Sequence, residues 1–225
     1  IERASLRGSV IAADDPELRA AQARFDMPAS VDVVGFDAVV LVAGTASIYS
    51  ALRLLQGHRV SCWSRDEAPL PEGKALISEP AFTAALTDQA RAGYSRRFAT
   101  ALRAASAVPF FVVPQPYPSE RVFESTRPSA YGFHRAHNAG EGVRIAASLT
   151  RALDAGFADL PGVKVLHQPA DTVAHGFTTA RAYTRDAVRV DGDTAQDTTD
   201  LLHVGPAFGA RVLARVLEAL TPIDA

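Results

Sequence analysis

The sequence has very little sulfur and no long uninterrupted apolar run. Its 225 residues include one cysteine and one methionine. A single cysteine, Cys62, excludes an internal disulfide, and its apolar surroundings predict a buried position in the core. The most apolar stretch, residues 31–43, contains two aspartates and a glycine. It is also shorter than the roughly 18 residues that a membrane helix needs, so the sequence predicts a soluble protein with no membrane span.

A strong excess of charge of either sign is also missing. The chain has 23 basic and 25 acidic residues, which gives a formal net charge of -2. The arginines are spread along predicted helices rather than gathered on one face, so we expect no nucleic-acid partner. Hydrophobic residues make up 48% of the chain. That content is enough to close one core, and the sequence therefore predicts a single domain over residues 1–225.

Hydrophobic spacing predicts alternating strands and helices. Continuous apolar runs predict buried strands at residues 36–44, 110–113 and 163–166, and the first of these is expected at the centre of the sheet. A shorter run over residues 8–13 favours a short edge strand. Apolar residues at helical spacing predict long helices at residues 82–105, 141–157 and 206–220.

This alternation predicts an α/β fold with a doubly wound, mostly parallel sheet and helices on both faces, a three-layer sandwich. Ligands of such sheets bind beyond the carboxyl ends of the strands. Two segments without a clear periodic pattern, residues 114–138 and 168–199, each follow such a strand end. We expect both to be functional loops.

Residues able to carry chemistry stand just before the last predicted helix. A spacing of three residues in a turn lets the Asp200 carboxylate reach the Nδ1–H of His203. This contact would fix the imidazole tautomer and leave Nε2 free to accept a proton, as in two thirds of a hydrolytic triad. The alternative is that Asp200 caps the last helix and His203 only packs beside it.

The stretch Asp200-Leu201-Leu202-His203-Val204-Gly205-Pro206 resembles the last sequence block of the SGNH (GDSL-like, flavodoxin-like) hydrolases. The strand that ends at Gly44 resembles the block whose glycine N–H lines the oxyanion hole, and residues 113–116 resemble the end of that family's fourth strand. The resemblance covers about residues 36–220. It implies an esterase or acyltransferase that acts on a small or carbohydrate-linked ester and needs no metal or cofactor.

The resemblance breaks down at one oxyanion donor. The family has an asparagine two residues after the glycine, whereas this chain reads Gly44-Thr45-Ala46-Ser47 and Ala46 has no donor. Losing one such donor typically lowers turnover on the order of 10²–10³-fold. Thr45 and Ser47 are the nearest candidates to replace it.

The nucleophile of the family is also missing from the expected place. Its serine follows the first strand, and no strand with such a turn is found before residue 36. We expect that strand and its serine upstream of Ile1. Two alternatives stay open: a non-catalytic relative that binds a ligand or partner, and an unusual nucleophile such as Ser47, which follows a buried strand.

An upstream segment would leave the compartment open, because it could include a signal peptide. The single cysteine implies no oxidising compartment, so the cytoplasm is favoured.

Other polar residues give weaker indications. Gln115 and His134 follow the second predicted strand and are candidates for substrate contact. The spacing of His134 and His137 could place both on one helix face, yet no carboxylate motif accompanies them, so we expect no metal site. After Gly44 the chain lacks the two further glycines of a dinucleotide-binding turn, which leaves no expected cofactor.

Overall fold

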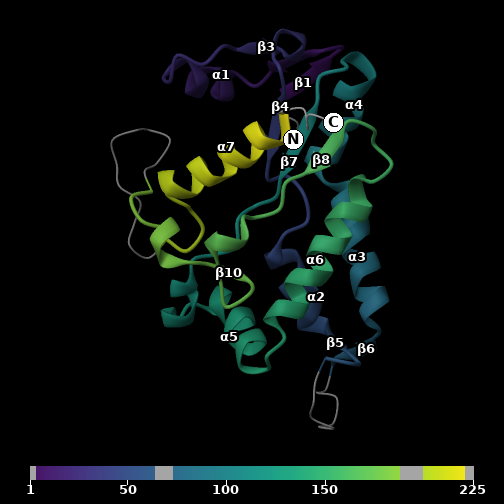
Figure 1. The fold of residues 1–225 in the computed structure, drawn as a ribbon, viewed down its shortest axis with the longest axis vertical. Coiled ribbons are helices and arrows are strands. Elements are labelled where there is room, and N and C mark those ends of the chain that lie inside the picture. Colours follow the sequence, from purple (N-terminus) through teal and green to yellow (C-terminus); the bar gives the residue numbers. More distant parts are fainter. Residues whose placement is uncertain (1–3, 64–72, 188–199, 221–225) are drawn as a thin grey trace.

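The computed structural model describes residues 4–63, 73–187 and 200–220. These residues form a mixed α/β structure in which a small parallel sheet is flanked by helices (Figure 1). No helix within these ranges is long and apolar enough to cross a membrane. The last part of the predicted loop at 168–199 lies outside the described residues.

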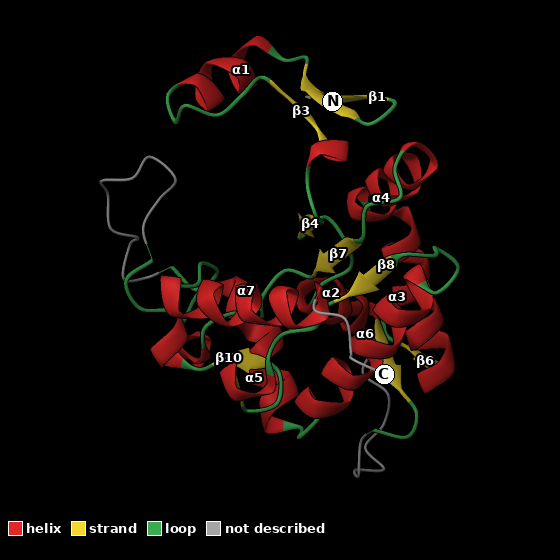
Figure 2. Cartoon of the chain, turned by 45° about the horizontal axis from the view of Figure 1, so that its top comes forward, coloured by secondary structure: helices red, strands yellow, loops and turns green. Residues whose placement is uncertain are grey.

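The parallel sheet is built from the three predicted apolar runs. Its strands are β4 (Val39–Val42), β7 (Phe110–Val113) and β8 (Val163–Val165), in the order β4-β7-β8 (Figure 2). All four residues of β7 are buried, as expected for the middle strand of a covered parallel sheet. The carboxyl ends of the three strands point the same way, which defines the edge where a ligand is expected.

The prediction that residues 36–44 form the central strand is wrong for the sheet of the described residues. Among the described residues β4 pairs only with β7, and Val40 and Val42 are 40% and 67% exposed. Val39 donates its N–H to the carbonyl of Pro109, just before β7, at 3.0 Å, and Ala43 donates its N–H to the Val113 carbonyl at 2.8 Å. Because backbone groups alternate between the two sides of a strand, those of Val40 and Val42 face the open edge. A β-branched run predicts a strand but not its number of neighbours.

Helices cover both faces of this sheet. On one face Phe111 and Val113 of β7 pack against Val216 of α7 (Pro206–Leu220). On the other face Phe110 packs against Leu102 of α4 (Tyr94–Ala105). The predicted helix at 206–220 is confirmed, and so is the one at 141–157, which is α6 (Gly142–Phe157).

The long helix predicted over residues 82–105 is two helices. The first, α3 (Glu79–Ala92), ends at Gly93, whose backbone is extended with ψ of 155°, and α4 follows. A Cβ atom on Gly93 would lie 2.6 Å from the Gly44 carbonyl oxygen. The apolar spacing continues through the break, so the pattern alone did not reveal it.

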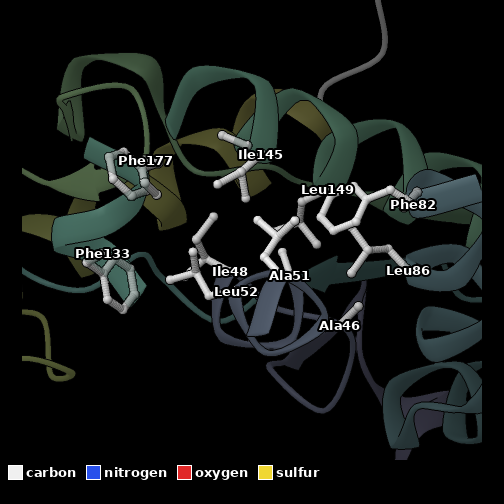
Figure 3. Close-up of a cluster of buried hydrophobic side chains, with 14 of the residues drawn as sticks. Ala46, Ile48, Ala51, Leu52, Phe82, Leu86, Phe133, Ile145, Leu149 and Phe177 are labelled. Atoms are coloured by element: carbon white, nitrogen blue, oxygen red, sulfur yellow. The ribbon is translucent and has the colours of Figure 1, made fainter. Parts of the chain in front are cut away.

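The largest core lies between helices rather than on the sheet. It joins α2 (Ile48–Gly57), α3, α6 and α5 (Tyr131–Asn138). Figure 3 shows Ile48 and Leu52 of α2 facing Ile145 of α6. This packing fixes the first turn of α2, which follows β4, relative to the rest of the molecule.

An antiparallel unit precedes the parallel sheet. It consists of β1 (Ala4–Arg7), β2 (Val10–Ala13), β3 (Ser30–Asp32), α1 (Pro16–Ala23) and a 3-10 turn, η1 (Val33–Gly35). It lies at one end of the molecule in Figures 1 and 2. The strand predicted at 8–13 is β2, and it is the middle strand of this sheet rather than an edge strand. The predicted fold, a doubly wound parallel sheet, does not include this antiparallel unit.

The segments predicted to be irregular contain short elements. After β7 come η2 (Glu120–Glu124), η3 (Pro128–Ala130) and α5, and after β8 come η4 (Ala170–Thr172), β9 (Val173–Ala174), β10 (Thr178–Thr179) and η5 (Arg181–Tyr183). A further two-stranded parallel sheet pairs β5 (His58–Val60) with β6 (Ala75–Ile77).

The predicted core position of Cys62 is wrong, because this side chain is exposed. Its neighbour Trp63 takes the interior position and is only 4% exposed. The Trp63 indole donates a 2.7 Å hydrogen bond to Glu79. Both residues lie in a turn after β5, in which the Trp63 N–H donates to the Val60 carbonyl at 3.3 Å, and this turn directs the indole rather than the thiol into the core.

Candidate functional site

Asp200 and His203 form a hydrogen-bonded pair in the loop before α7. The Asp200 Oδ2 atom contacts Nδ1 of His203. The other carboxylate oxygen, Oδ1, accepts the backbone N–H groups of Leu202 at 2.7 Å and His203 at 3.2 Å. The contact predicted from the spacing is therefore confirmed. One carboxylate both closes the turn and holds the imidazole.

The alternative, in which Asp200 caps the last helix, does not describe this geometry. Helix α7 begins at Pro206, and the amides that Asp200 accepts belong to its own turn. The imidazole of His203 is not packed away either, since its side chain is 59% exposed, against 18% for Asp200. Its Nε2 atom is left outside the contact with the carboxylate.

Contacts on both sides hold this turn in place. The Leu201 carbonyl accepts the backbone N–H of Ser119 at 2.8 Å, and the Leu201 side chain packs on the large core. On the other side the Gly205 N–H donates to the Tyr183 carbonyl at 2.7 Å. A Cβ atom on Gly205 would lie 1.8 Å from the Arg185 carbonyl oxygen, so only glycine fits there.

Opposing effects act on the pKa of Asp200. Burial raises it, but the hydrogen bonds from the Leu202 N–H and the His203 ring lower it, and the net pKa lies below the ordinary value of 3.8. The carboxylate is therefore charged at neutral pH. A charged Asp200 orients the imidazole through Nδ1 and stabilises an imidazolium if one forms.

A cavity of about 310 Å³ opens beside this turn. It is lined by Tyr49, Val122, Arg127, Ser129, Phe133, Asp200, Leu201 and Leu202. Tyr49 lies in the first turn of α2, directly after the connection from β4, whereas Ser129 belongs to η3. The cavity thus joins segments that are distant in the sequence, one of them the helix that follows β4, and His203 is not among its lining residues.

Tyr49 and Asp200 approach each other across this cavity. Burial, and secondarily the negative charge of Asp200, raises the pKa of Tyr49. The phenol ring packs edge-on against Phe133, with ring centroids 5.2 Å apart and an interplanar angle of 72°. Tyr49 is therefore a fixed and protonated side chain.

The predicted oxyanion residues follow β4 but do not line this cavity. Ala43 and Gly44 both have positive φ, 60° and 67°, and the Gly44 carbonyl accepts the Ser95 N–H at 3.0 Å. Thr45 Oγ1 is buried and has no hydrogen-bond partner among the described residues. Ser47 is 7% exposed and caps α2, since it exchanges hydrogen bonds with Ser50.

The structure places Gln115 elsewhere. Gln115 follows β7 and lines a second groove of about 460 Å³, together with His167, Gln168 and residues of α6. His167 Nε2 contacts Asp154 at 2.7 Å, so this groove has an Asp–His pair of its own. The structure therefore does not bring Gln115 together with Asp200.

His134 does not line the cavity either, although its neighbour Phe133 does. Its Nε2 atom lies 3.0 Å from the Ser125 carbonyl, and its ring packs edge-on against Phe123. His137 packs against Phe123 and His175. Among residues 4–63, 73–187 and 200–220, no group of three or more histidine, cysteine or acidic side chains could hold a metal ion.

Three polar residues of the cavity, Tyr49, Arg127 and Ser129, are not predicted by the sequence pattern. Tyr49 follows the predicted strand end by a few residues, which is a signal that could have been used. Arg127 and Ser129 lie in a turn whose position depends on tertiary contacts. No local pattern identifies them.

Comparisons of this chain with protein-family models, with curated proteins and with solved structures found no match.

Proposed function

We propose that this protein cleaves an ester, or transfers its acyl group, with His203 as general base and Asp200 as the carboxylate that orients it. The substrate is a small or carbohydrate-linked ester. The observation that carries the proposal is the Asp200–His203 hydrogen bond in a turn whose Asp200 lines a cavity next to the helix that follows β4. The cavity volume, about 310 Å³, suits a small acyl or alkoxy group.

In the proposed reaction, His203 Nε2 accepts the proton of an attacking hydroxyl. The hydroxyl oxygen bonds to the ester carbon, and the carbonyl electron pair moves onto the carbonyl oxygen. When this intermediate collapses, the bond to the leaving alcohol breaks and His203 returns the proton to it. Asp200 remains ionised throughout and stabilises the transient imidazolium.

We attribute the attacking hydroxyl to a serine on a further strand, as the resemblance to the SGNH hydrolases implies. The open edge of β4 supports this assignment, because a parallel strand added there would have its carboxyl end at the same edge of the sheet as β4. The sheet β4-β7-β8 would then be part of a larger, doubly wound sandwich of the SGNH type.

The apolar surface at this edge supports the same assignment. Val40 and Val42 lie on the sheet face that α7 covers, because they pair with Phe111 and Val113. Both valines are nevertheless exposed, and so is Leu213 of α7, at 58%. The apolar face of α7 is therefore wider than the three strands beneath it. Burial of this apolar surface by a further strand would stabilise the protein by about 25 cal/mol per Å².

The alternative is a non-catalytic domain that binds a ligand or partner. It is favoured by the burial of the connection after β4, where Ala46, Ser47 and the Thr45 hydroxyl are not accessible to solvent. These residues offer no side-chain donor to an oxyanion.

The test is hydrolysis of p-nitrophenyl acetate by the full-length protein and its His203→Ala variant. Because a general base contributes about 10²–10⁴-fold, the variant should lose at least about 10²-fold in kcat/KM. His167→Ala removes the histidine that contacts Asp154 in the second groove and should keep the parent rate. A His203→Ala variant as active as the parent would reject His203 as the base, whereas an inactive but folded parent supports the binding domain.

Ser129 is a second variant for the same assay, because it is the serine of the described chain that lines the cavity. It lies in an exposed 3-10 turn and not at a strand end. Ser129→Ala should therefore retain most of the activity. Complete loss would move the nucleophile from the added strand to Ser129.

A further inference from the structure

We infer that the phenolic hydroxyl of Tyr49 donates a hydrogen bond to the ester carbonyl oxygen and replaces the side-chain donor missing at Ala46. This inference rests on the proposed function, and it assigns a catalytic residue that the sequence pattern did not indicate. Tyr49 is the only residue of the β4–α2 connection and of the described part of α2 that lines the cavity.

The other polar side chains of the β4–α2 connection either cap a helix or are buried away from solvent. Ser47 accepts the Ser50 N–H and caps α2. Thr45 Oγ1 is buried away from solvent. The Tyr49 hydroxyl, in contrast, forms no hydrogen bond to another described residue and belongs to a side chain in the cavity wall. It is therefore available to a ligand.

Tyr49 is held rigidly enough to act as a preformed donor. Its ring packs edge-on against Phe133, which is only 1% exposed. Its backbone belongs to the first turn of α2, whose helix is fixed by the large core. A donor that does not reorganise during the reaction stabilises developing charge best.

The electrostatic setting keeps the Tyr49 phenol protonated. Burial and the Asp200 charge raise the pKa of Tyr49, so the phenol keeps its proton over the pH range in which esters are assayed. The positive end of the α2 dipole lies at the same turn and adds to the stabilisation of negative charge. When the carbonyl electron pair moves onto oxygen, the Tyr49 O–H strengthens its hydrogen bond without giving up its proton.

The test is Tyr49→Phe in the full-length protein, which deletes one oxygen and keeps the ring on Phe133. With p-nitrophenyl acetate, kcat should fall by about 10²–10³-fold, as for loss of one oxyanion donor. KM should stay within about twofold, because the bond matters mainly in the transition state. Thermal unfolding should be unchanged, since the hydroxyl has no hydrogen-bond partner among the described residues.

Tyr131→Phe is the matched control, because Tyr131 is 61% exposed and does not line the cavity. It should retain the parent kcat. Full activity of Tyr49→Phe alongside an inactive His203→Ala would overturn the role of Tyr49 and leave the proposed function standing. A folded parent without esterase activity would overturn both.

Discussion

A Cβ atom on Gly93 would lie 2.6 Å from the Gly44 carbonyl oxygen, so the junction between α3 and α4 is pressed against the connection that follows β4. The same connection is tied by the Ser95 N–H, which donates to the Gly44 carbonyl at 3.0 Å. These contacts fix where α2 begins. They therefore fix the position of Tyr49 in the cavity wall beside Asp200.

Asp200→Asn tests the orienting role of the carboxylate. The amide is similar in shape but can hold the wrong imidazole tautomer, so kcat for an ester should fall by about 10³–10⁴-fold. Asp154→Asn is the matched control, because it alters the Asp–His pair of the second groove. Equal losses in the two variants would show a general effect on the fold rather than a role for Asp200.

The stability of the protein should depend on the charge of Asp200 at acid pH. The folded-state pKa of Asp200 is below 3.8, so its stabilising contribution is present above about pH 4. It is lost as the pH falls through the lower folded value. Urea unfolding should show a smaller difference between the parent and Asp200→Asn at pH 3 than at pH 5. A difference that grows on acidification would contradict the lowered pKa.

Gly205 and Gly209 give opposite predictions for the same substitution. Gly205→Ala would bring a methyl group to 1.8 Å from the Arg185 carbonyl, and overpacking of this kind costs about 1–3 kcal/mol. Gly209 lies in α7 with nothing within 4 Å of its added Cβ. Gly209→Ala should stabilise the helix by about 0.5–1 kcal/mol. Chemical denaturation of both variants measures the difference, which would vanish if the turn were loosely held.

Val42→Lys tests whether the edge of β4 is covered in the full-length protein. Val42 is 67% exposed beside the other described residues. If a further strand covers it, the buried charge should lower the free energy of unfolding by about 2 kcal/mol or more. Val143→Lys, at a 63% exposed position of α6, should change it by less than about 0.5 kcal/mol. Equal, small effects of the two lysines would mean that the edge stays open.

The strands and helices that were predicted correctly are those whose own residues show the full hydrophobic pattern of that element. The run Phe110–Val113 is apolar at every position, and α7 repeats its apolar residues at helical spacing from Phe208 to Val216. The position of β4 at a sheet edge and the break at Gly93 depend on contacts between distant segments. No spacing within either segment reveals them.

The candidate site likewise has one part that the sequence predicts and one part that it does not. The Asp200–His203 contact spans three residues, so the sequence was sufficient to predict it. The cavity required the β4–α2 connection, η3 and the Asp200 loop to meet, and their separation along the chain hides that meeting. For this reason Tyr49 emerged only from the structure, while Gln115 and His134 proved to lie elsewhere.

The central claim, that Asp200 holds His203 by Nδ1 and leaves Nε2 as the base, can be measured by long-range ¹H–¹⁵N NMR of the histidine rings. At a pH where His203 is neutral, we expect a proton on Nδ1 and an unprotonated Nε2, and Asp200→Asn should abolish this preference. A neutral His203 with its proton on Nε2 in the parent protein would rule out this arrangement of the pair.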